Sequence, residues 1–101
     1  MYIYNVTAKV DVAIHQSWLR WMQEVHIPDV LSTGLFTHHR ILHLLDQDET
    51  DGVTYAIQYF CTHLDQYHAY IQHHAPVMRK HVTDTWGEQV FLFRTIMEVI
   101  N

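Results

Sequence analysis

Apolar and polar residues alternate along four stretches of the chain and recur at helical spacing along two others. Alternation combined with β-branched and aromatic residues predicts strands over Tyr2–Val10 and Val53–Cys61. The stretches Leu35–Leu45 and Gln89–Ile100 have the same character and complete the set of predicted strands. The acidic segment Asp46–Gly52 ends in Asp-Gly and is expected to be a hairpin loop between antiparallel neighbours.

The first helical region is expected between the first two strands. Its apolar residues fall on one helix face: Ile14, Trp18, Trp21, Met22 and Val25. Pro28 is expected to start a short second segment that brings Ile27, Val30 and Leu31 to the core. Gly34 then closes the region, because glycine readily adopts the left-handed conformation that ends many helices.

The second helical region is expected to begin at a capping box formed by Thr62 and Asp65. Pro76 predicts a break in this region and Gly87 its end. Its apolar face comprises Leu64, Tyr67, Ile71, Ala75, Met78, Val82 and Trp86. The order β-α-β-β-α-β indicates one ferredoxin-like α+β domain over residues 1–101, in which strand one lies between strands three and four.

Residue parity along the predicted strands separates two faces of the open sheet. The face expected in the core carries Tyr2, Tyr4, Val6, Ala8, Val10, Tyr55, Ile57, Tyr59, Phe91, Phe93, Met97 and Val99. The opposite face carries Ile3, Asn5, Thr7, Lys9, Phe36, His38, Arg40, Leu42, Leu44, Ala56, Gln58, Phe60, Leu92, Arg94, Ile96, Glu98 and Ile100. This second face is too apolar for free exposure and too polar for a core. We therefore expect a homodimer in which two such faces pair and enclose a cavity.

Composition narrows the classes of partner and the compartment. The 101 residues include eleven acids and six scattered bases, for a formal charge of −5, so we expect no nucleic-acid partner and no binding to anionic membranes. No apolar run approaches the roughly 20 residues that span a bilayer, and no signal peptide is apparent. One cysteine, Cys61, is consistent with a reducing compartment, and we expect a cytoplasmic protein.

The ten histidines do not predict a metal site. His39 and His43 share one strand face but lie roughly 13 Å apart at the usual rise per residue, too far to share an ion. The pairs His38-His39 and His73-His74 point in different directions. Cys61 precedes a helix N-terminus, but a small buried residue at a strand end is the favoured interpretation.

The segment His26–Leu31 before Thr33–Phe36, together with the topology and the mixed sheet face, resembles the dimeric α+β barrel superfamily. More closely, Met1–Thr7, Thr54–Phe60 and Arg94–Val99 look like an uncharacterised family of short bacterial proteins. The resemblance covers the whole chain and implies a fold rather than a reaction. The superfamily includes cofactor-free monooxygenases, haem-degrading enzymes, dehydratases and modules without known activity.

The chain has only some of the residues with which the haem-degrading members of this superfamily work. The haem-degrading branch works with an asparagine, a histidine and a tryptophan. Asn5 and one of His68, His73 or His74 match the first two, but no tryptophan lies between Cys61 and Ala75. We therefore expect no cofactor.

Three classes of function stay open. The first is a homodimer that binds a small organic molecule, with a carboxylate or phenolate as the expected anion. The second is a cofactor-independent enzyme of monooxygenase or isomerase type, and the third a purely structural dimerisation module. The expected ligand site lies on the mixed face: Asn5, Arg40, Gln58, Arg94 and Glu98, with His26 and His38 at its edge. The alternative role for Arg94 and Glu98 is a salt bridge that closes the dimer.

Overall fold

A computed structural model describes the whole chain, residues 1–101. The elements in chain order are strand β1 (Tyr2–Asp11), helix α1 (His15–Trp21), π-turn η1 (Met22–His26), helix α2 (Ile27–Ser32), strands β2 (His38–His43) and β3 (Gly52–Cys61), helices α3 (Leu64–His73) and α4 (Ala75–Trp86), 3₁₀ turn η2 (Gly87–Gln89) and strand β4 (Val90–Glu98). No helix is long and apolar enough to cross a membrane.

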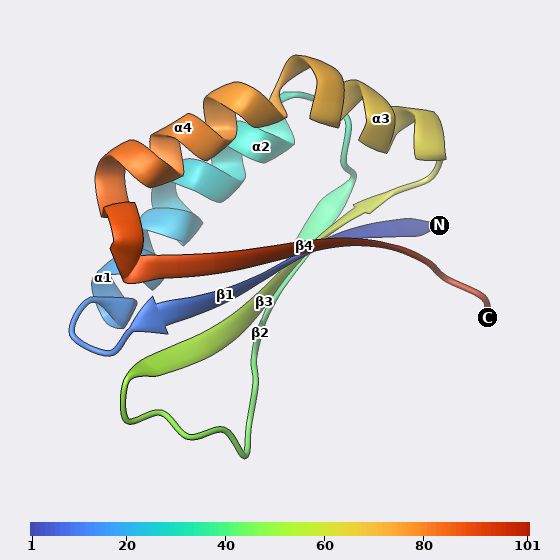
Figure 1. Cartoon of the computed structure of the whole chain (residues 1–101). Helices are drawn as coiled ribbons and strands as arrows, with labels where there is room; N and C mark the ends of the chain where they lie inside the picture. The colour runs from blue at the N-terminus through green and yellow to red at the C-terminus, as the bar shows by residue number, and fades with distance from the viewer.

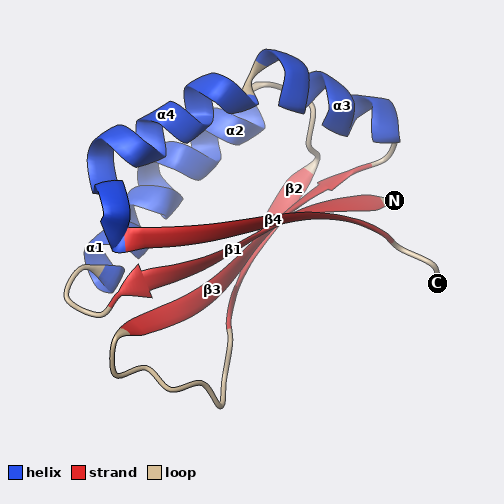
Figure 2. Ribbon diagram, viewed as in Figure 1, coloured by secondary structure: helices blue, strands red, loops and turns tan.

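The strands form one antiparallel sheet in the order β2-β3-β1-β4. β1 lies between β3 and β4, which confirms the strand order and the ferredoxin-like arrangement that the sequence predicts. All helices cover the same face of the sheet, and the other face is left open (Figures 1 and 2). We call these the helix face and the open face. The protein thus consists of two layers with the core between them.

The first helical region contains a π-turn just before Pro28. A proline in a continuous α-helix removes the hydrogen bond to the residue four positions earlier and clashes with its carbonyl. The turn η1 absorbs this mismatch, because its wider hydrogen-bonding ring accommodates one extra residue. The extra residue shifts the inward-facing side by one position, so His26 is buried while Val25 is 44% exposed. The prediction that Val25 lies on the buried face is therefore wrong.

The second helical region follows the prediction in its break and its end. It divides at His74, just before Pro76, and stops at Gly87, whose φ is +59°. The cap lies one residue later than expected. The side-chain oxygen of Gln66, rather than of Asp65, accepts hydrogen bonds from the backbone N–H groups of Thr62 and His63.

An aromatic cluster fills the centre of the core. Tyr4 on β1 packs against Phe36, Tyr59, Tyr67 and Tyr70, with ring centroids 5.4–6.1 Å apart. Phe36 precedes β2, which begins only at His38, and its ring turns into the core at 5% exposure. Its expected position on the open face is therefore wrong, because the parity of a strand does not extend to residues outside it.

The faces of β4 are the reverse of those that the sequence predicts. Val6 pairs with Arg94 and Ala8 with Leu92, so the even-numbered residues of β4 share the helix face with the even-numbered residues of β1. Phe91 and Phe93 lie on the open face, 59% and 60% exposed, with their rings in edge contact. Apolar residues occupy both parities of this strand, so alternation alone did not determine its orientation.

Candidate functional site

Four of the expected site residues share the open face. Asn5 pairs with Gln58, and Gln58 pairs with Arg40, across three adjacent strands. The Asn5 side chain donates a hydrogen bond to Thr7 at 3.0 Å and accepts one from Gln58 at 3.4 Å. Here the polar groups of Asn5, Thr7 and Gln58 already satisfy one another.

Phe60 organises the remaining part of the open face. His38 stacks on its ring with centroids 4.3 Å apart, and the Arg40 guanidinium lies 5.4 Å from the ring centroid. These two side chains shield Phe60, which is only 7% exposed. His38 and Arg40 thus cover an aromatic ring on the open face, and no hollow is found beside them.

The other three expected site residues lie elsewhere. His26 is part of the helical layer, and Arg94 belongs to the helix face of the sheet. Glu98 ends β4 opposite Tyr2 and is exposed. No ion pair joins Arg94 to Glu98, since the ion pairs of the chain are His43–Glu49 and Lys80–Asp84. The expected grouping of all these residues on one face is therefore wrong.

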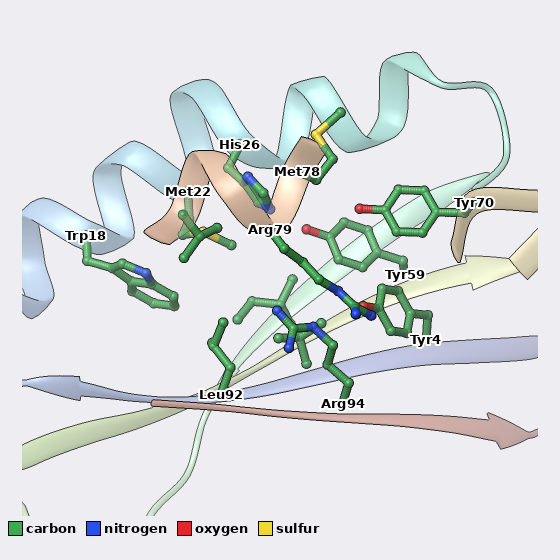
Figure 3. A pocket seen from close by; sticks show the side chains of 13 residues that line it. Tyr4, Trp18, Met22, His26, Tyr59, Tyr70, Met78, Arg79, Leu92 and Arg94 are labelled. Carbon is green, nitrogen blue, oxygen red and sulfur yellow. The ribbon is translucent and has the colours of Figure 1, made fainter. Parts of the chain in front are cut away.

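A hollow lies between the helix face and the helices. It encloses about 440 Å³ of space including its mouth, whereas the space open to the centre of a water molecule is about 30 Å³. Its walls come from β1, β3 and β4 below and from α1, η1, α3 and α4 above (Figure 3). The residues that line it are Tyr4, Val6, Trp18, Met22, His26, Ile57, Tyr59, Tyr70, Met78, Arg79, Val82, Leu92 and Arg94.

Two arginines converge on this hollow from opposite layers. Arg94 extends upward from β4 and Arg79 reaches down from α4, and both side chains line the hollow (Figure 3). No aspartate or glutamate is among the lining residues, and neither arginine takes part in an ion pair. Both side chains are solvent-exposed, which keeps the cost of these unpaired charges low. The hollow thus has a positively charged mouth.

His26 is held neutral beside these charges. Burial lowers the pKa of His26 to about 4; Asp29 acts against this shift, while His81 and Arg94 act with it. The imidazole stacks on Trp21 with ring centroids 5.2 Å apart, and this contact fixes its plane. At neutral pH its ring nitrogens are one donor and one acceptor.

Three tyrosine hydroxyls point into the hollow. They belong to Tyr4, Tyr59 and Tyr70, which come from β1, β3 and α3 (Figure 3). Burial raises the pKa of Tyr59 and of Tyr70 above their usual range, so both phenols keep their protons. Arg79 and Arg94 both oppose the shift in the pKa of Tyr70, as expected for cations near its hydroxyl.

Three enclosed polar atoms on the walls lack a hydrogen-bond partner. They are Trp18 Nε1, His26 Nδ1 and the Tyr59 hydroxyl. Their residues are 1%, 8% and 2% exposed. Most buried polar atoms in proteins are hydrogen-bonded, because leaving one unpaired costs about 1–3 kcal/mol. A set of unpaired atoms on one hollow is typical of a site that a ligand or ordered water completes.

Sequence reasoning missed most of this site. Neither Arg79 nor Tyr70 was singled out, and Tyr59 and Trp18 were interpreted only as core. The signal for Arg79 is its position three residues before Val82 on the inner side of α4, beside Met78. Cys61, by contrast, is a fully buried free cysteine as expected, and burial raises the pKa of its thiol. No group of three or more metal-ligating side chains lies close enough to hold an ion.

Comparison with solved structures supports the ferredoxin-like fold. A protein of the ethyl tert-butyl ether d (EthD) family from Bacillus halodurans matches with a TM-score of 0.66 and 13% identity over 99% of this chain and 100% of its own. A dimeric ferredoxin-like protein from an uncultured marine organism matches with a TM-score of 0.60 and 14% identity over 99% and 95%. A putative antibiotic biosynthesis monooxygenase from Deinococcus radiodurans matches with a TM-score of 0.59 and 17% identity over 100% and 94%. At these identities the likeness shows the fold alone.

Sequence comparison identifies the family. No curated protein matches the chain at a significant level. The model of a family described as a domain of unknown function, DUF4286, matches residues 1–100. The chain therefore belongs to this family, and its function must be argued from the site.

Proposed function

We propose that this protein is a homodimer whose subunits each bind a small organic anion in the hollow between the sheet and the helices. The observation that carries this proposal is the convergence of Arg79 and Arg94 on a hollow that no acidic side chain lines. The location differs from the mixed open face that the sequence suggested, but the expected chemistry of the ligand is the same.

The excess of acidic over basic residues makes it notable that two arginines line one hollow. Acids outnumber bases by eleven to six, yet two of the six basic residues meet at one hollow without a carboxylate partner. A guanidinium presents a rigid fork of N–H donors that matches the two oxygens of a carboxylate. The apolar remainder of the walls would bind the hydrophobic part of an organic ligand.

Ligand retention provides a direct test. Native mass spectrometry of freshly purified protein should show a bound mass, and calorimetric titration should detect binding of benzoate as a generic organic anion. Arg94→Met should lower the benzoate affinity by about tenfold or more, since one charge-assisted hydrogen bond is worth about 1.5–3 kcal/mol. Arg20→Met is the matched control, because Arg20 is an exposed cation of α1 outside the hollow.

The other two functional classes are distinguished by the same preparation. Oxygen-dependent or spontaneous conversion of a retained ligand would identify an enzyme of monooxygenase or isomerase type. A protein that retains no ligand and binds no organic anion, yet dimerises, would be a structural module. Equal benzoate affinities in the wild type and Arg94→Met would contradict the proposed site.

The open face supports the dimer. Phe91 and Phe93 expose large apolar surfaces there, and Leu42 at the far side of the sheet is 37% exposed. Exposed apolar patches of this kind commonly mark an interface. A fold neighbour is itself described as dimeric. Light scattering at micromolar concentration should give twice the chain mass of 12.1 kDa.

We also propose that the protein works in the cytoplasm. The support is Cys61, the sole cysteine, which is a buried free thiol and suits a reducing compartment. Fractionation of the native host, followed by immunodetection, tests this location.

A further inference from the structure

The hollow presents more donors than acceptors to a ligand. A guanidinium and an indole N–H can only donate hydrogen bonds, and this applies to Arg79, Arg94 and Trp18. Trp18 Nε1 is enclosed and unpaired, so its donor is available inside the hollow. A ligand that satisfies these groups must therefore carry acceptor oxygens at more than one place.

His26 adds a different requirement. Its neutral imidazole has an enclosed, unpaired Nδ1, which is a donor in one tautomer and an acceptor in the other. A hydroxyl group serves either tautomer, because it donates one hydrogen bond and accepts others. The enclosed Tyr59 hydroxyl is likewise unpaired and has the same dual capacity.

The shape and size of the hollow limit the ligand further. Met22 on the helical side and Leu92 on the sheet side form opposite apolar walls, with Trp18 at one end and the tyrosine hydroxyls at the other (Figure 3). Only about 30 Å³ of the hollow is open to the centre of a water molecule, so its enclosed part is small and the rest of a ligand must occupy the open mouth. A single flat ring fits between such walls better than a polycyclic system.

We infer that the hollow takes a single-ring hydroxyaryl carboxylate, whose carboxylate binds Arg79 and Arg94 and whose hydroxyl faces His26 Nδ1. This assignment rests on the proposed function and names the class of ligand for the same site. The exposed arginines at the mouth bind the charged end, where it keeps part of its hydration. The enclosed end receives the neutral hydroxyl, which is less costly to desolvate than a charge.

The test is a calorimetric comparison of four probes: benzoate, 3-hydroxybenzoate, 4-hydroxybenzoate and cyclohexanecarboxylate. At least one hydroxybenzoate should bind about tenfold or more tighter than benzoate, because a site built for a hydroxyl leaves polar groups unpaired around the analogue without it. Cyclohexanecarboxylate, of similar size but not flat, should bind more weakly than benzoate. In His26→Leu the ratio of hydroxybenzoate to benzoate affinity should fall to about one.

Trp18→Phe provides a second variant that keeps a ring in the wall but removes the indole N–H. It should reduce the same affinity ratio, and circular dichroism verifies that each variant is folded. If His26→Leu fails to fold, Trp18→Phe alone decides: an unchanged ratio overturns the inference.

The remaining outcomes separate this inference from the proposed function. Equal binding of benzoate and both hydroxybenzoates, with loss in Arg94→Met, would leave the anion site standing and overturn the hydroxyl assignment. An affinity ratio that survives in both the His26 and the Trp18 variants would also overturn it. Failure of every probe to bind would refute both proposals and indicate that ordered water completes the enclosed polar atoms.

Discussion

Val6 and Arg94 are direct cross-strand neighbours on β1 and β4. This pairing puts the Arg94 side chain on the helix face, because opposite residues of an antiparallel pair point to the same side of the sheet. One register therefore has two consequences: it adds a cation to the hollow and leaves Phe91 and Phe93 on the open face. The candidate ligand site and the candidate interface are the two faces of the same strand.

The first prediction concerns the open face. Phe93→Lys should convert the dimer to a monomer, because it replaces a large apolar contact at each side of the interface with a charge that meets its own symmetry copy. Light scattering measures the mass. Val77→Lys is the matched control, since Val77 is similarly exposed, at 55%, but lies on α4 in the helical layer. A wild-type protein of monomer mass would contradict the proposed interface.

The second prediction concerns the pH dependence of stability. The pKa of His26 is about 4 in the folded protein and 6.5 at its ordinary value. Between these two pKa values His26 is protonated in the unfolded chain but neutral in the folded protein. The free energy of unfolding therefore falls as the pH drops from above 6.5 toward 4. By linkage the loss from this group is about 2 kcal/mol between about pH 8 and about pH 5.

Denaturant unfolding of the wild type and His26→Gln at both pH values measures this loss. Glutamine does not titrate, so the difference in unfolding free energy between the two proteins should shift by about 2 kcal/mol in favour of the variant at the lower pH. The other histidines are common to both proteins and cancel in the comparison. A constant difference across the range would show that His26 is not held neutral.

The sequence determined much of the fold because several elements have local signals. Gly34 and Gly87 end their helices with positive φ, and the helix break falls just before Pro76. The large residues of β1 and β3 occupy one parity, so the faces of these strands were predicted correctly. In each case one residue type or one alternation favours a single conformation.

The site was harder to predict because it depends on how distant parts of the chain pair and pack against one another. β4 has apolar residues at both parities, so its orientation is fixed only by pairing with β1. The burial of His26 depends on a π-turn, which no spacing rule for α-helices contains. Arg79 and Arg94 line one hollow only when α4 lies over the sheet. These residues come from three separated segments, and nothing local to any one of them indicates a shared hollow.

The third prediction tests the helix end at Gly34. Its φ is +76°, and a Cβ added there would meet no atom within 4 Å, so a substitution changes the backbone energy without a clash. Gly34→Ala should lower the unfolding free energy by about 1–2 kcal/mol, the cost of the left-handed conformation for an L-residue. Gly34→Asn should cost less, because asparagine tolerates this region. Equal stabilities of all three proteins would contradict the assigned conformation.

The last prediction compares two buried tyrosines of β3 that differ in their hydroxyl partners. The Tyr55 hydroxyl lies 2.9 Å from His15 Nδ1, whereas the Tyr59 hydroxyl is enclosed without a partner. Tyr55→Phe should lower the unfolding free energy by about 1 kcal/mol, because it breaks a hydrogen bond and leaves the imidazole nitrogen unpaired. Tyr59→Phe should leave the free protein equally stable or raise its unfolding free energy by about 1 kcal/mol, because it removes an unpaired polar group from the core.

Binding should respond in the opposite sense. The Tyr59 hydroxyl is unpaired in the free protein and gains a hydrogen-bond partner only when a ligand binds. Tyr59→Phe should therefore weaken binding of the tightest hydroxybenzoate, while Tyr55→Phe leaves its affinity unchanged. Tyr55 is absent from the walls of the hollow, which makes it the matched control for Tyr59. Denaturant unfolding and calorimetry on the same four preparations, namely the wild type, the two single variants and the double variant, measure both effects. If Tyr59→Phe destabilised the free protein as much as Tyr55→Phe, its hydroxyl would have a partner in the folded chain, and its place in the site would be structural.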